Sequence, residues 1–480
     1  MSNKFNDYKL SSEILKSIND LRYNTMTEVQ EKVLPNILNG KDVIVKSQTG
    51  SGKTAAFAIP ICEKLNWEDN DPQVLVLAPT RELAIQISED FKNIGRYKRL
   101  KPVSIYGKAP FKEQERALKQ KTHIVAGTPG RILDHIDRGT LNINNIKYLV
   151  LDEADEMLNM GFIEQVENVI KKLPKKRQTM LFSATIPEEI KKLCHKYMKN
   201  EVNIEIERKN IVNSNIEQLK IIVPEMEKYK LLNNILLKEK PEAAVIFCRT
   251  KENVDKVFEF LKKKSYSVDK IHGGMMQKDR TAVMEKFKMK YFRILTATDV
   301  AARGIDVDNI TLVINLDIPM EKENYVHRIG RCGRASNKGK AITFVTPYED
   351  KFLREIEEYI REDIKEGDKG DFNIEAHERK EAEDFLKKGI KKVQSKGKNV
   401  GKDITKLYFN GGKKKKIRVL DLVGTISSIE GIESNDIGII DIQDNCSYVD
   451  ILNGKGKKVM QIMKEKTVKG KMLKVEIAKK

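Results

Sequence analysis

The sequence is poor in cysteine and has no long apolar run. Its five cysteines stand far apart among 480 residues, and no two of them have C-x-x-C spacing. Zinc sites and disulfide frameworks use cysteines at short, regular spacings, so neither fits and a reducing compartment is expected. No stretch approaches the roughly 18 apolar residues that a membrane-spanning helix needs, and the first residues lack the pattern of a secretory signal. We therefore expect a soluble, cytoplasmic protein without a membrane partner.

The charge balance is basic. Lys and Arg number 89 against 70 Asp and Glu, which gives a formal net charge of +19. A surplus of this size favours a polyanionic partner, because neutralising each phosphate releases counterions. Charge alone does not separate a nucleic-acid-binding protein from an ordinary basic one. At about 100–200 residues per domain, the length predicts two to four domains.

Short apolar runs alternate with longer amphipathic stretches over the first 360 residues. This alternation predicts open, parallel α/β sheets with helices on both faces. The apolar runs fall into two sets with a break near 203–215, so two similar α/β domains in tandem are expected. The expected strands are 43–45, 74–78, 123–126, 148–151 and 180–182 in the first set, and 244–248, 268–272, 293–296, 312–316 and 341–345 in the second.

The character of the sequence changes after residue 362. Residues 361–402 are dense in Lys, Glu and Asp and have few strand signals, which is typical of a charged linker, although residues 375–393 could form a helix within it. Beyond them, strand-like and helix-like runs follow in the order β-α-β-β-α-β, the order of a ferredoxin-like or RRM-like α+β domain. The expected strands there are 406–410, 438–442, 448–452 and 473–478, and the expected helices are 419–429 and 457–466.

Residues 47–54, SQTGSGKT, follow an expected strand and open an expected helix. Glycines at 50 and 52 allow backbone N–H groups to converge on phosphate oxygens, while Lys53 reaches the β- and γ-phosphates and Thr54 can ligate Mg²⁺. Ser47 stands where the strict P-loop pattern has glycine, so this is a variant form. A glycine-rich turn without a ligand is disfavoured by the preceding strand and the closing Gly-Lys-Thr.

The acidic segment 152–155 follows another expected strand, about 100 residues after the P-loop. Asp152 is placed to hold Mg²⁺, and Glu153 is placed to orient or deprotonate the attacking water. By itself such a segment is most often a solvated turn, but after a P-loop it predicts ATP hydrolysis. Upstream, Gln30 could read adenine through an amide that both donates and accepts. Thr27 and Gln30 would otherwise be ordinary residues at the start of a helix.

Further segments complete a family pattern: PTREL at 79–83, TPGR at 128–131, SAT at 183–185, DVAARGID at 299–306 and HRIGRCGR at 327–334. Together with the P-loop and the acidic segment, they make residues 5–360 resemble the DEAD-box RNA helicases. The resemblance implies two tandem RecA-like domains with parallel sheets. The expected division is 1–207 for the first domain, 208–362 for the second, 363–403 for the linker and 404–480 for the C-terminal domain.

The resemblance implies a role for each motif residue at an ATP–Mg²⁺ site. Adenine recognition falls to Phe5, Thr27 and Gln30, phosphate binding to Ser47, Gly50, Gly52, Lys53 and Thr54, and ribose contact to Gly304 and Asp306. Thr54 and Asp152 would hold the metal. The catalytic set would be Lys53, Asp152, Glu153, His327, Arg331 and Arg334, in which the two arginines act as fingers on the γ-phosphate. Surface ion pairing is the alternative for those arginines. Ser183 and Thr185 would couple hydrolysis to domain movement.

RNA contacts implied by the resemblance are hydroxyl, guanidinium and small groups suited to phosphate and ribose, so core binding should be salt-sensitive and independent of sequence. They are Arg81, Thr128, Gly130 and Arg131 in the first domain and Arg249, Gln277, Arg280 and Thr298 in the second. ATP and RNA would close the domains together and bend one strand out of its duplex. Four residues depart from the family pattern without removing a ligand: Arg22, Met26, Lys108 and Cys332.

Residues 404–480 resemble the C-terminal domain of the DbpA helicases, most of all the form of Gram-positive bacteria. The run 406–418 carries most of this resemblance and contains Lys413, Lys414, Lys415, Lys416 and Arg418. Tyr448, and whichever of Tyr408 and Phe409 faces outward, could stack on bases, but 446–452 lacks the aromatic-rich RNP1 pattern. We therefore expect recognition to depend mainly on the lysines, the alternative being a solvated hairpin. The resemblance implies a 23S rRNA hairpin near the peptidyl-transferase centre and pre-50S particles as targets.

Three functions remain for comparison. The favoured one is an ATP-dependent helicase for short RNA duplexes, acting in large-subunit assembly and expected to be a monomer. An ATP-gated RNA clamp or scaffold would use the same motifs, although Glu153, Arg331 and Arg334 favour turnover. A double-stranded DNA translocase also has two such domains, but Gln30 and the RRM-like domain argue against it.

Overall fold

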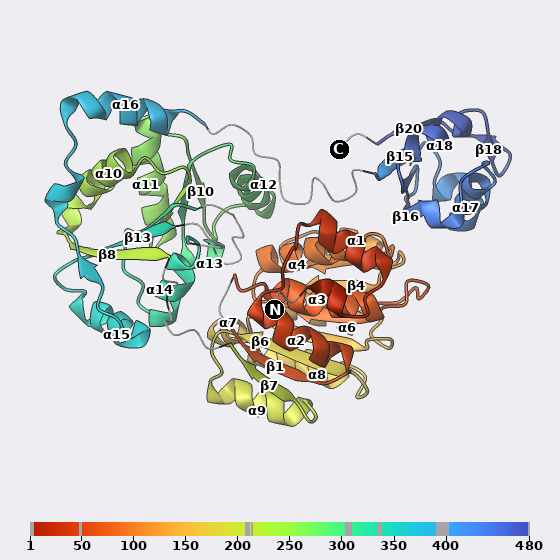
Figure 1. Cartoon of the computed structure of the whole chain (residues 1–480), viewed down its shortest axis with the longest axis horizontal. Coiled ribbons are helices and arrows are strands. Elements are labelled where there is room, and N and C mark those ends of the chain that lie inside the picture. Colours follow the sequence, from red (N-terminus) through yellow and green to blue (C-terminus); the bar gives the residue numbers. More distant parts are fainter. Residues whose placement is uncertain are drawn as a thin grey trace. The chain divides into compact units, whose positions relative to one another are not determined.

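The computed structural model describes residues 4–47, 50–206, 212, 215–302, 310–333, 338–389 and 403–478. These residues form two seven-stranded sheets, one four-stranded sheet and one two-stranded hairpin. Helices flank each of the large sheets (Figure 1). None of the helices within these ranges is long and apolar enough to cross a membrane.

The first sheet has the order β3-β4-β2-β5-β6-β1-β7, and all of its strand pairs are parallel. Its central strands are rich in Val, Ile and Leu and are buried along their whole length, as a parallel sheet covered on both faces requires. The strands are β1 (Val43–Lys46), β2 (Val74–Leu77), β3 (Pro102–Ile105), β4 (Ile124–Gly127), β5 (Tyr148–Asp152), β6 (Gln178–Ser183) and β7 (Val202–Glu205).

Two apolar clusters cover the two faces of this sheet. One contains residues of η1 (Phe5–Asp7), α1 (Ser12–Asp20), α2 (Glu28–Leu38), α3 (Lys53–Lys64) and α4 (Arg81–Ile94). The other contains residues of α6 (Pro129–Asp137), α7 (Ala154–Asn159), α8 (Ile163–Lys172) and α9 (Glu188–Tyr197). The short helix α5 (Phe111–Leu118) contributes Leu118 to the second cluster as a partly buried residue.

The second sheet repeats this architecture with the order β10-β11-β9-β12-β13-β8-β14, again parallel throughout. Its strands are β8 (Ile216–Ile222), β9 (Ala244–Phe247), β10 (Val268–Ile271), β11 (Ile294–Ala297), β12 (Leu312–Asn315), β13 (Gly339–Val345) and β14 (Lys365–Glu366). One face carries α12 (Gln277–Lys288), α13 (Asp299–Ala302), α14 (Lys322–Ile329) and α15 (Asp350–Ile360). The other carries α10 (Lys228–Glu239), preceded by η2 (Glu225–Glu227), α11 (Lys251–Lys263) and α16 (Ala376–Lys387).

Residues 363–389, which the composition assigns to a linker, belong to the second domain. β14 pairs with β8, and η3 (Lys369–Phe372) and α16 place Phe372, Ala382 and Leu386 in the core. The Arg293 guanidinium also donates to the carbonyl of Lys388 at 2.8 Å. The linker prediction is wrong over this stretch, because the many charged residues of α16 face solvent and conceal the few apolar residues that anchor it.

The third sheet is antiparallel, with the order β16-β17-β15-β20. The chain passes through β15 (Thr405–Phe409), η4 (Lys413–Lys415), α17 (Val419–Ser427), η5 (Ser434–Asp436), β16 (Ile437–Ile442), β17 (Ser447–Ile451), α18 (Gly456–Met463), the hairpin β18 (Thr467–Val468) and β19 (Lys471–Met472), and β20 (Val475–Ile477). The predicted fold class, two parallel α/β domains and a β-α-β-β-α-β domain, is confirmed. The hairpin before the last strand was not predicted.

His123 provides a test of the first domain's packing. Its Nδ1 accepts from the Lys101 N–H at 2.8 Å and its Nε2 donates to the Trp67 carbonyl at 2.9 Å, so the ring is held neutral. Burial lowers the pKa of His123 to about 4, whereas the unfolded chain takes up a proton near pH 6.5. The stability that the neutral ring contributes is therefore complete above about pH 6.5 and is lost as the pH falls towards about 4.

We predict that His123→Gln flattens this pH dependence, because an amide can accept from Lys101 and donate to Trp67 without titrating. The measurement is the melting temperature of both proteins between pH 7 and pH 5. The melting temperature of the wild type should fall more steeply, because its unfolding takes up about one more proton per molecule. His377→Gln, at an exposed position on α16, is the matched control and should follow the wild type. Parallel curves for wild type and His123→Gln would contradict the assignment.

Candidate nucleotide and RNA sites

The P-loop lies between β1 and α3 in the first domain. Ser47 is buried directly after β1, and Lys53, the first residue of α3, is buried with its Nζ donating to the Ser47 carbonyl at 3.2 Å. Gly50 and Gly52 have φ of 79° and 89°, the left-handed region in which glycine is favoured. The residues at 48 and 49 are outside the described ranges. The expected strand–loop–helix arrangement is present, with backbone N–H groups at the start of α3.

The Thr27–Gln30 segment packs against this loop. Thr27 precedes α2 as its N-cap, and its N–H donates to Gln30 Oε1 at 3.0 Å. Gln30 Nε2 in turn donates to the Gly52 carbonyl at 3.3 Å. Phe5 is buried in the cluster beside α1 and α2. The structure therefore brings Thr27 and Gln30 to the P-loop and gives Phe5 a packing role in the same domain.

Asp152 ends β5 with only 3% of its surface exposed. Burial raises the pKa of its carboxyl to about 6, although Lys53 opposes the shift. Glu153 follows in the left-handed region, with φ 52°, and its N–H donates to Asp152 Oδ1 at 3.0 Å. A buried carboxylate beside the P-loop lysine fits a site for a cation and a phosphate.

The Asp155 carboxylate ties the acidic segment to residues 183–185. Its Oδ2 accepts from the N–H of Ala184 at 3.1 Å, the N–H of Thr185 at 2.8 Å and the Thr185 hydroxyl at 3.0 Å. The Ser183 hydroxyl accepts from the Asp155 N–H at 3.1 Å. These bonds join the end of β6 to the start of α7. Sequence reasoning had assigned no role to Asp155.

In the second domain, Arg328 joins the two late motifs. It forms a bidentate ion pair with Asp299, in which the Nη2–Oδ2 distance is 2.7 Å, and its Nη1 donates to the Asp317 carbonyl at 2.7 Å. Arg331 is buried, and its Nε donates to the His327 carbonyl at 3.1 Å. Gly304, Asp306 and Arg334 lie outside the described residues. Arg328 was missed as a site residue, although it stands within the HRIGRCGR segment.

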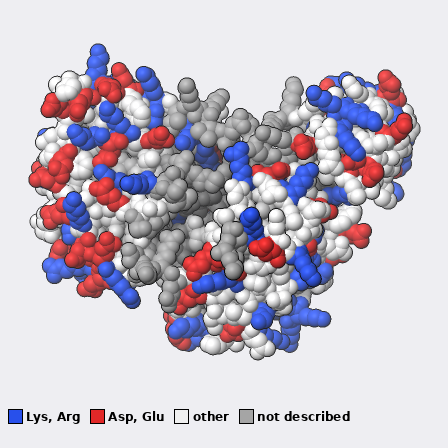
Figure 2. Space-filling view, viewed as in Figure 1, with Lys and Arg blue, Asp and Glu red and all other residues white. Residues whose placement is uncertain are grey.

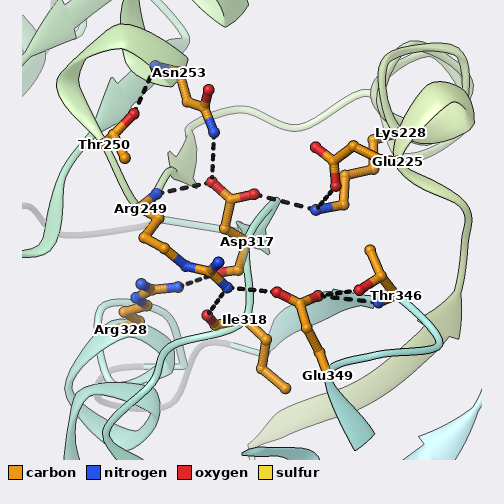
Figure 3. A network of polar contacts seen from close by, with 10 residues as sticks. All are labelled: Glu225, Lys228, Arg249, Thr250, Asn253, Asp317, Ile318, Arg328, Thr346 and Glu349. Carbon is orange, nitrogen blue, oxygen red and sulfur yellow. Dashed lines mark hydrogen bonds and ion pairs between the residues drawn. The ribbon is translucent and has the colours of Figure 1, made fainter.

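Asp317 organises the loop that follows β12 (Figure 3). Its carboxylate accepts from the N–H of Arg249 at 2.8 Å, from Asn253 Nδ2 at 3.2 Å and from Lys228 Nζ at 3.1 Å. Burial by itself would raise the pKa of Asp317, but the Arg249 N–H and Lys228 hold it below its usual range. Lys228 is almost fully buried and also pairs with Glu225. No sequence signal marked Lys228 or Asp317.

The predicted RNA residues of the second domain lie at the strand ends and at the start of α12. Arg249 follows β9, and its Nη2 contacts Glu349 and donates to the Ile318 carbonyl at 3.3 Å (Figure 3). Thr298 follows β11, and Gln277 begins α12. Arg280 is buried on the same helix. The guanidinium of Arg249 thus has an acidic partner within its own domain.

The predicted RNA residues of the first domain share one edge of the sheet. Arg81 begins α4 after β2, and Thr128 is the N-cap of α6 after β4. Because β2 and β4 are parallel neighbours, these two helix starts lie side by side. Arg131 Nη1 donates to the Ala109 carbonyl at 3.0 Å. Gly130, next to it, is tight enough that an added Cβ would lie 3.0 Å from Gln165 Oε1.

The C-terminal lysines are on an exposed turn, because Lys413, Lys414 and Lys415 form η4. Leu407 and Phe409 face the core, so Tyr408 lies on the opposite face of the sheet with Tyr448, 5.6 Å between ring centroids. Asp441 pairs with Tyr448 and Glu476 with Tyr408 in the strand register. The tyrosines therefore have acidic neighbours. Figure 2 shows basic and acidic side chains mixed over the visible described surface, so the net charge by itself locates no RNA site.

Fold and site together define a two-domain P-loop ATPase of the helicase class. The DEAD/DEAH box helicase model matches residues 27–193, the helicase conserved C-terminal domain model matches 227–336, and the DbpA RNA binding domain model matches 406–477. ATP-dependent RNA helicase DbpA of Bacillus subtilis is 55% identical over 99% of this chain and 99% of its own length. The chain belongs to the DEAD-box ATP-dependent RNA helicases of the DbpA type, and it is an RNA-dependent ATPase and helicase with an RNA-binding C-terminal domain.

Other relatives match the first two domains. DEAD-box ATP-dependent RNA helicase CshA of Bacillus subtilis is 46% identical over 75% of this chain and 72% of its own length. S. cerevisiae Dbp5 bound to RNA and ADP BeF3 is 30% identical, with a TM-score of 0.72 over 80% of this chain and 100% of that chain. Mss116p bound to ssRNA and AMP-PNP is 28% identical, with a TM-score of 0.69 over 81% of this chain and 84% of that chain.

We predict that Gly52→Ala abolishes ATP binding. A Cβ there would lie 2.7 Å from Gln30 Nε2 and 3.1 Å from Thr27 Oγ1, on a residue whose φ is 89°. The Gln30 amide must therefore move away from Gly52, which disturbs its bond to the Gly52 carbonyl. Gly40→Ala is the matched control, because its φ is also positive, 75°, but nothing lies within 4 Å of the added Cβ.

The control should lose only about 1 kcal/mol of stability from backbone strain and keep its ATP affinity. Fluorescent-nucleotide titration measures the change in ATP affinity, and thermal melting measures the change in stability. Retention of normal ATP affinity by Gly52→Ala would contradict the proposed contact between Gln30 and the P-loop.

Proposed function

We propose that this helicase unwinds short RNA duplexes locally and is directed by its C-terminal domain to 23S rRNA during assembly of the large ribosomal subunit. The observation that carries the targeting is the DbpA RNA binding domain at residues 406–477, joined to the complete helicase core. The target would be a hairpin near the peptidyl-transferase centre within pre-50S particles. The protein would act in the cytoplasm as a monomer, without a membrane partner.

ATP would bind at the carboxyl ends of β1 and β5. Lys53 and the N–H groups at the start of α3 would hold its phosphates, and Gln30 would read the adenine edge. The donor set also fits Mg²⁺: Asp152 is a buried carboxylate beside the P-loop, and Thr54 supplies a hydroxyl at the same loop. Bound there, Mg²⁺ would neutralise charge on the phosphates. The P-loop would be shaped by Ser47, Gly50 and Gly52. Phe5 and Thr27 would support it from the same side as Gln30.

Hydrolysis would need groups from both domains. Glu153 would orient the attacking water, while Arg331 and Arg334 would stabilise the γ-phosphate charge, a contribution of about 10³–10⁵ in rate in other phosphoryl-transfer enzymes. His327 would support the arginines, and Gly304 and Asp306 would contact the ribose. Turnover would then depend on closure of the two domains, which supports an enzyme rather than a passive binder.

Ser183 and Thr185 would carry the coupling. The three bonds that Asp155 accepts from Ala184 and Thr185 give the acidic segment a direct mechanical link to the end of β6. A shift of the acidic segment on hydrolysis would therefore move residues 183–185. That connection is the step by which the nucleotide state would alter the RNA-binding side of the domain.

RNA would run along the carboxyl ends of the strands of both domains. The first domain would supply Arg81, Thr128, Gly130 and Arg131, and the second would supply Arg249, Gln277, Arg280 and Thr298. These groups suit phosphate and ribose, so the core would bind any sequence. Selection would rest on Lys413, Lys414, Lys415, Lys416 and Arg418 of the C-terminal domain, with Tyr448 in a lesser role because its register neighbours include Asp441.

The alternative is an ATP-gated clamp in which unwinding is incidental. We favour the helicase because the groups for hydrolysis are all in the sequence, from Glu153 to the two arginines. A strand-displacement assay with a short duplex separates the two: a clamp would hold the duplex in the presence of ATP without releasing a strand.

The targeting proposal predicts that a 23S fragment carrying the peptidyl-transferase hairpin stimulates ATP hydrolysis at a lower RNA concentration than an unrelated duplex of equal length. Replacing Lys413–Lys416 by alanine should remove this preference while leaving stimulation by the unrelated duplex within about twofold, since the core contacts remain. Tyr448→Ala should lose much less of the preference. Equal stimulation by the two RNAs in the wild type would reject the targeting, and the helicase assignment would stand.

A further inference from the structure

Gln114 occupies an unusual place in the first domain. It is the one buried residue of the helix α5, whose other residues are exposed or partly buried. A short helix is ordinarily anchored by apolar side chains on its buried face, but here an amide with 6% of its surface exposed takes that position. Burying an amide costs free energy unless each polar atom has a partner. The contacts of the Gln114 amide therefore indicate its role.

The amide of Gln114 bonds to two separate segments, the start of α6 with the proposed RNA residue Arg131 and the turn after β3. Its Oε1 accepts from Arg131 Nη1 at 3.1 Å, and its Nε2 donates to the Tyr106 carbonyl at 2.9 Å. Arg131 Nη1 also donates to the Ala109 carbonyl at 3.0 Å. One side chain therefore fixes the guanidinium at the start of α6 and the turn after β3 relative to each other.

The turn at 106–109, which Gln114 holds, lies beside a further predicted RNA residue, Arg81. Lys108 is exposed within it and has a φ of 60°, a strained value for a lysine. A Cβ added to Gly107 would lie 3.8 Å from Arg81 Nη2, so the turn runs next to the first residue of α4. A strained turn keeps its shape only where its surroundings fix it, and the bond from Gln114 to Tyr106 is one such constraint.

The His135 ring also contacts the Gln114 amide. Its Nε2 lies 3.2 Å from Gln114 Oε1, which can only accept, so this nitrogen carries the ring proton. Its Nδ1 lies 2.8 Å from the Thr140 hydroxyl, which also donates to the His135 carbonyl at 3.1 Å. The ring stacks on Phe111, with centroids 4.0 Å apart and planes within 7°. These contacts leave Gln114 one orientation, with its acceptor towards Arg131 and its donor towards Tyr106.

We propose that Gln114 is a positioning residue for RNA binding, which holds the Arg131 guanidinium and the 106–109 turn as one preorganised surface for the RNA backbone. The inference rests on the proposed function, in which Arg131 contacts RNA. A guanidinium that is already oriented loses less conformational freedom when phosphate binds. Without Gln114, Arg131 keeps the Ala109 carbonyl, its ion pair with Asp134 and the Phe111 ring, whose centroid lies 5.8 Å from the guanidinium carbon.

The test variant is Gln114→Leu in the full chain, with ATP hydrolysis measured against RNA concentration at saturating ATP. Loss of a bond to a charged group should raise the RNA concentration for half-maximal stimulation about tenfold. The rate at saturating RNA and the half-saturating ATP concentration should stay within about twofold, because the P-loop and Asp152 are untouched.

Gln178→Leu is the matched control. Gln178 is also a buried glutamine of the first domain, and its Nε2 donates to the carbonyls of Ile37 and Lys41 at 3.3 and 2.6 Å. It stands at the start of β6, at the sheet edge opposite the P-loop. Both variants should lose thermal stability, but only Gln114→Leu should weaken RNA stimulation. An equal loss of RNA affinity in both would show that Gln114 is merely structural and would overturn the proposal.

A double-mutant cycle with Arg131→Ala tests whether Gln114 acts through Arg131. In the Arg131→Ala background, Gln114→Leu should raise the half-stimulating RNA concentration by only about two- to threefold, the share of the turn. If the two substitutions act independently, so that their fold-changes in half-stimulating RNA concentration multiply, the positioning role of Gln114 is rejected. If Arg131→Ala has no effect, the proposed RNA contact fails together with the inference. If Arg131→Ala weakens RNA binding and Gln114→Leu does not, only the inference fails.

Discussion

Parallel strand pairing is the constraint on which the sites of this protein depend. Because every pair in the two large sheets is parallel, all strands of a sheet end at the same edge, and loops far apart in sequence meet there. In the first domain this places the P-loop after β1, Arg81 after β2, Thr128 after β4 and Asp152 after β5. In the second it places Arg249, Thr298 and Asp317 at the ends of β9, β11 and β12. Among the described residues, those just named stand at or directly after strand ends and need no long loop to reach the site.

The sequence was most informative where a function needs a fixed local pattern. A P-loop requires glycines, Lys53 and Thr54 in order, so both its place and its strand–loop–helix context were predicted and found. The linker prediction failed for the opposite reason. A helix at 375–393 was considered possible, but the composition of the segment gives no sign that Ala382 and Leu386 anchor α16 in the core among many charged residues. Arg334, Gly304 and Asp306 were also predicted, but they lie outside the described residues.

The sequence could not show which residues of distant segments contact each other. Asp155 looked like part of an acidic turn, yet it accepts three bonds from residues about thirty positions later. Nothing in the sequence marked Lys228, which is almost fully buried against Asp317. Both cases follow from one rule: a buried charge must have a partner, and that partner is set by the tertiary fold. Gln114, a polar residue in a polar helix, was hidden in the same way.

The two proposed sets of RNA contacts differ in how their residues are held, and this difference bears on the roles proposed for them. Arg131, Arg249 and the turn at 106–109 are fixed by bonds to buried or partly buried groups, which suits a surface that must bind any RNA backbone in a constant geometry. The turn formed by Lys413–Lys415 is also held, through backbone bonds from Lys413 and Lys414 to Gln443 and Asp444, but its lysine side chains are exposed, which would let them follow the shape of one RNA. Selectivity can then reside in the C-terminal domain without any change to the ATPase machinery.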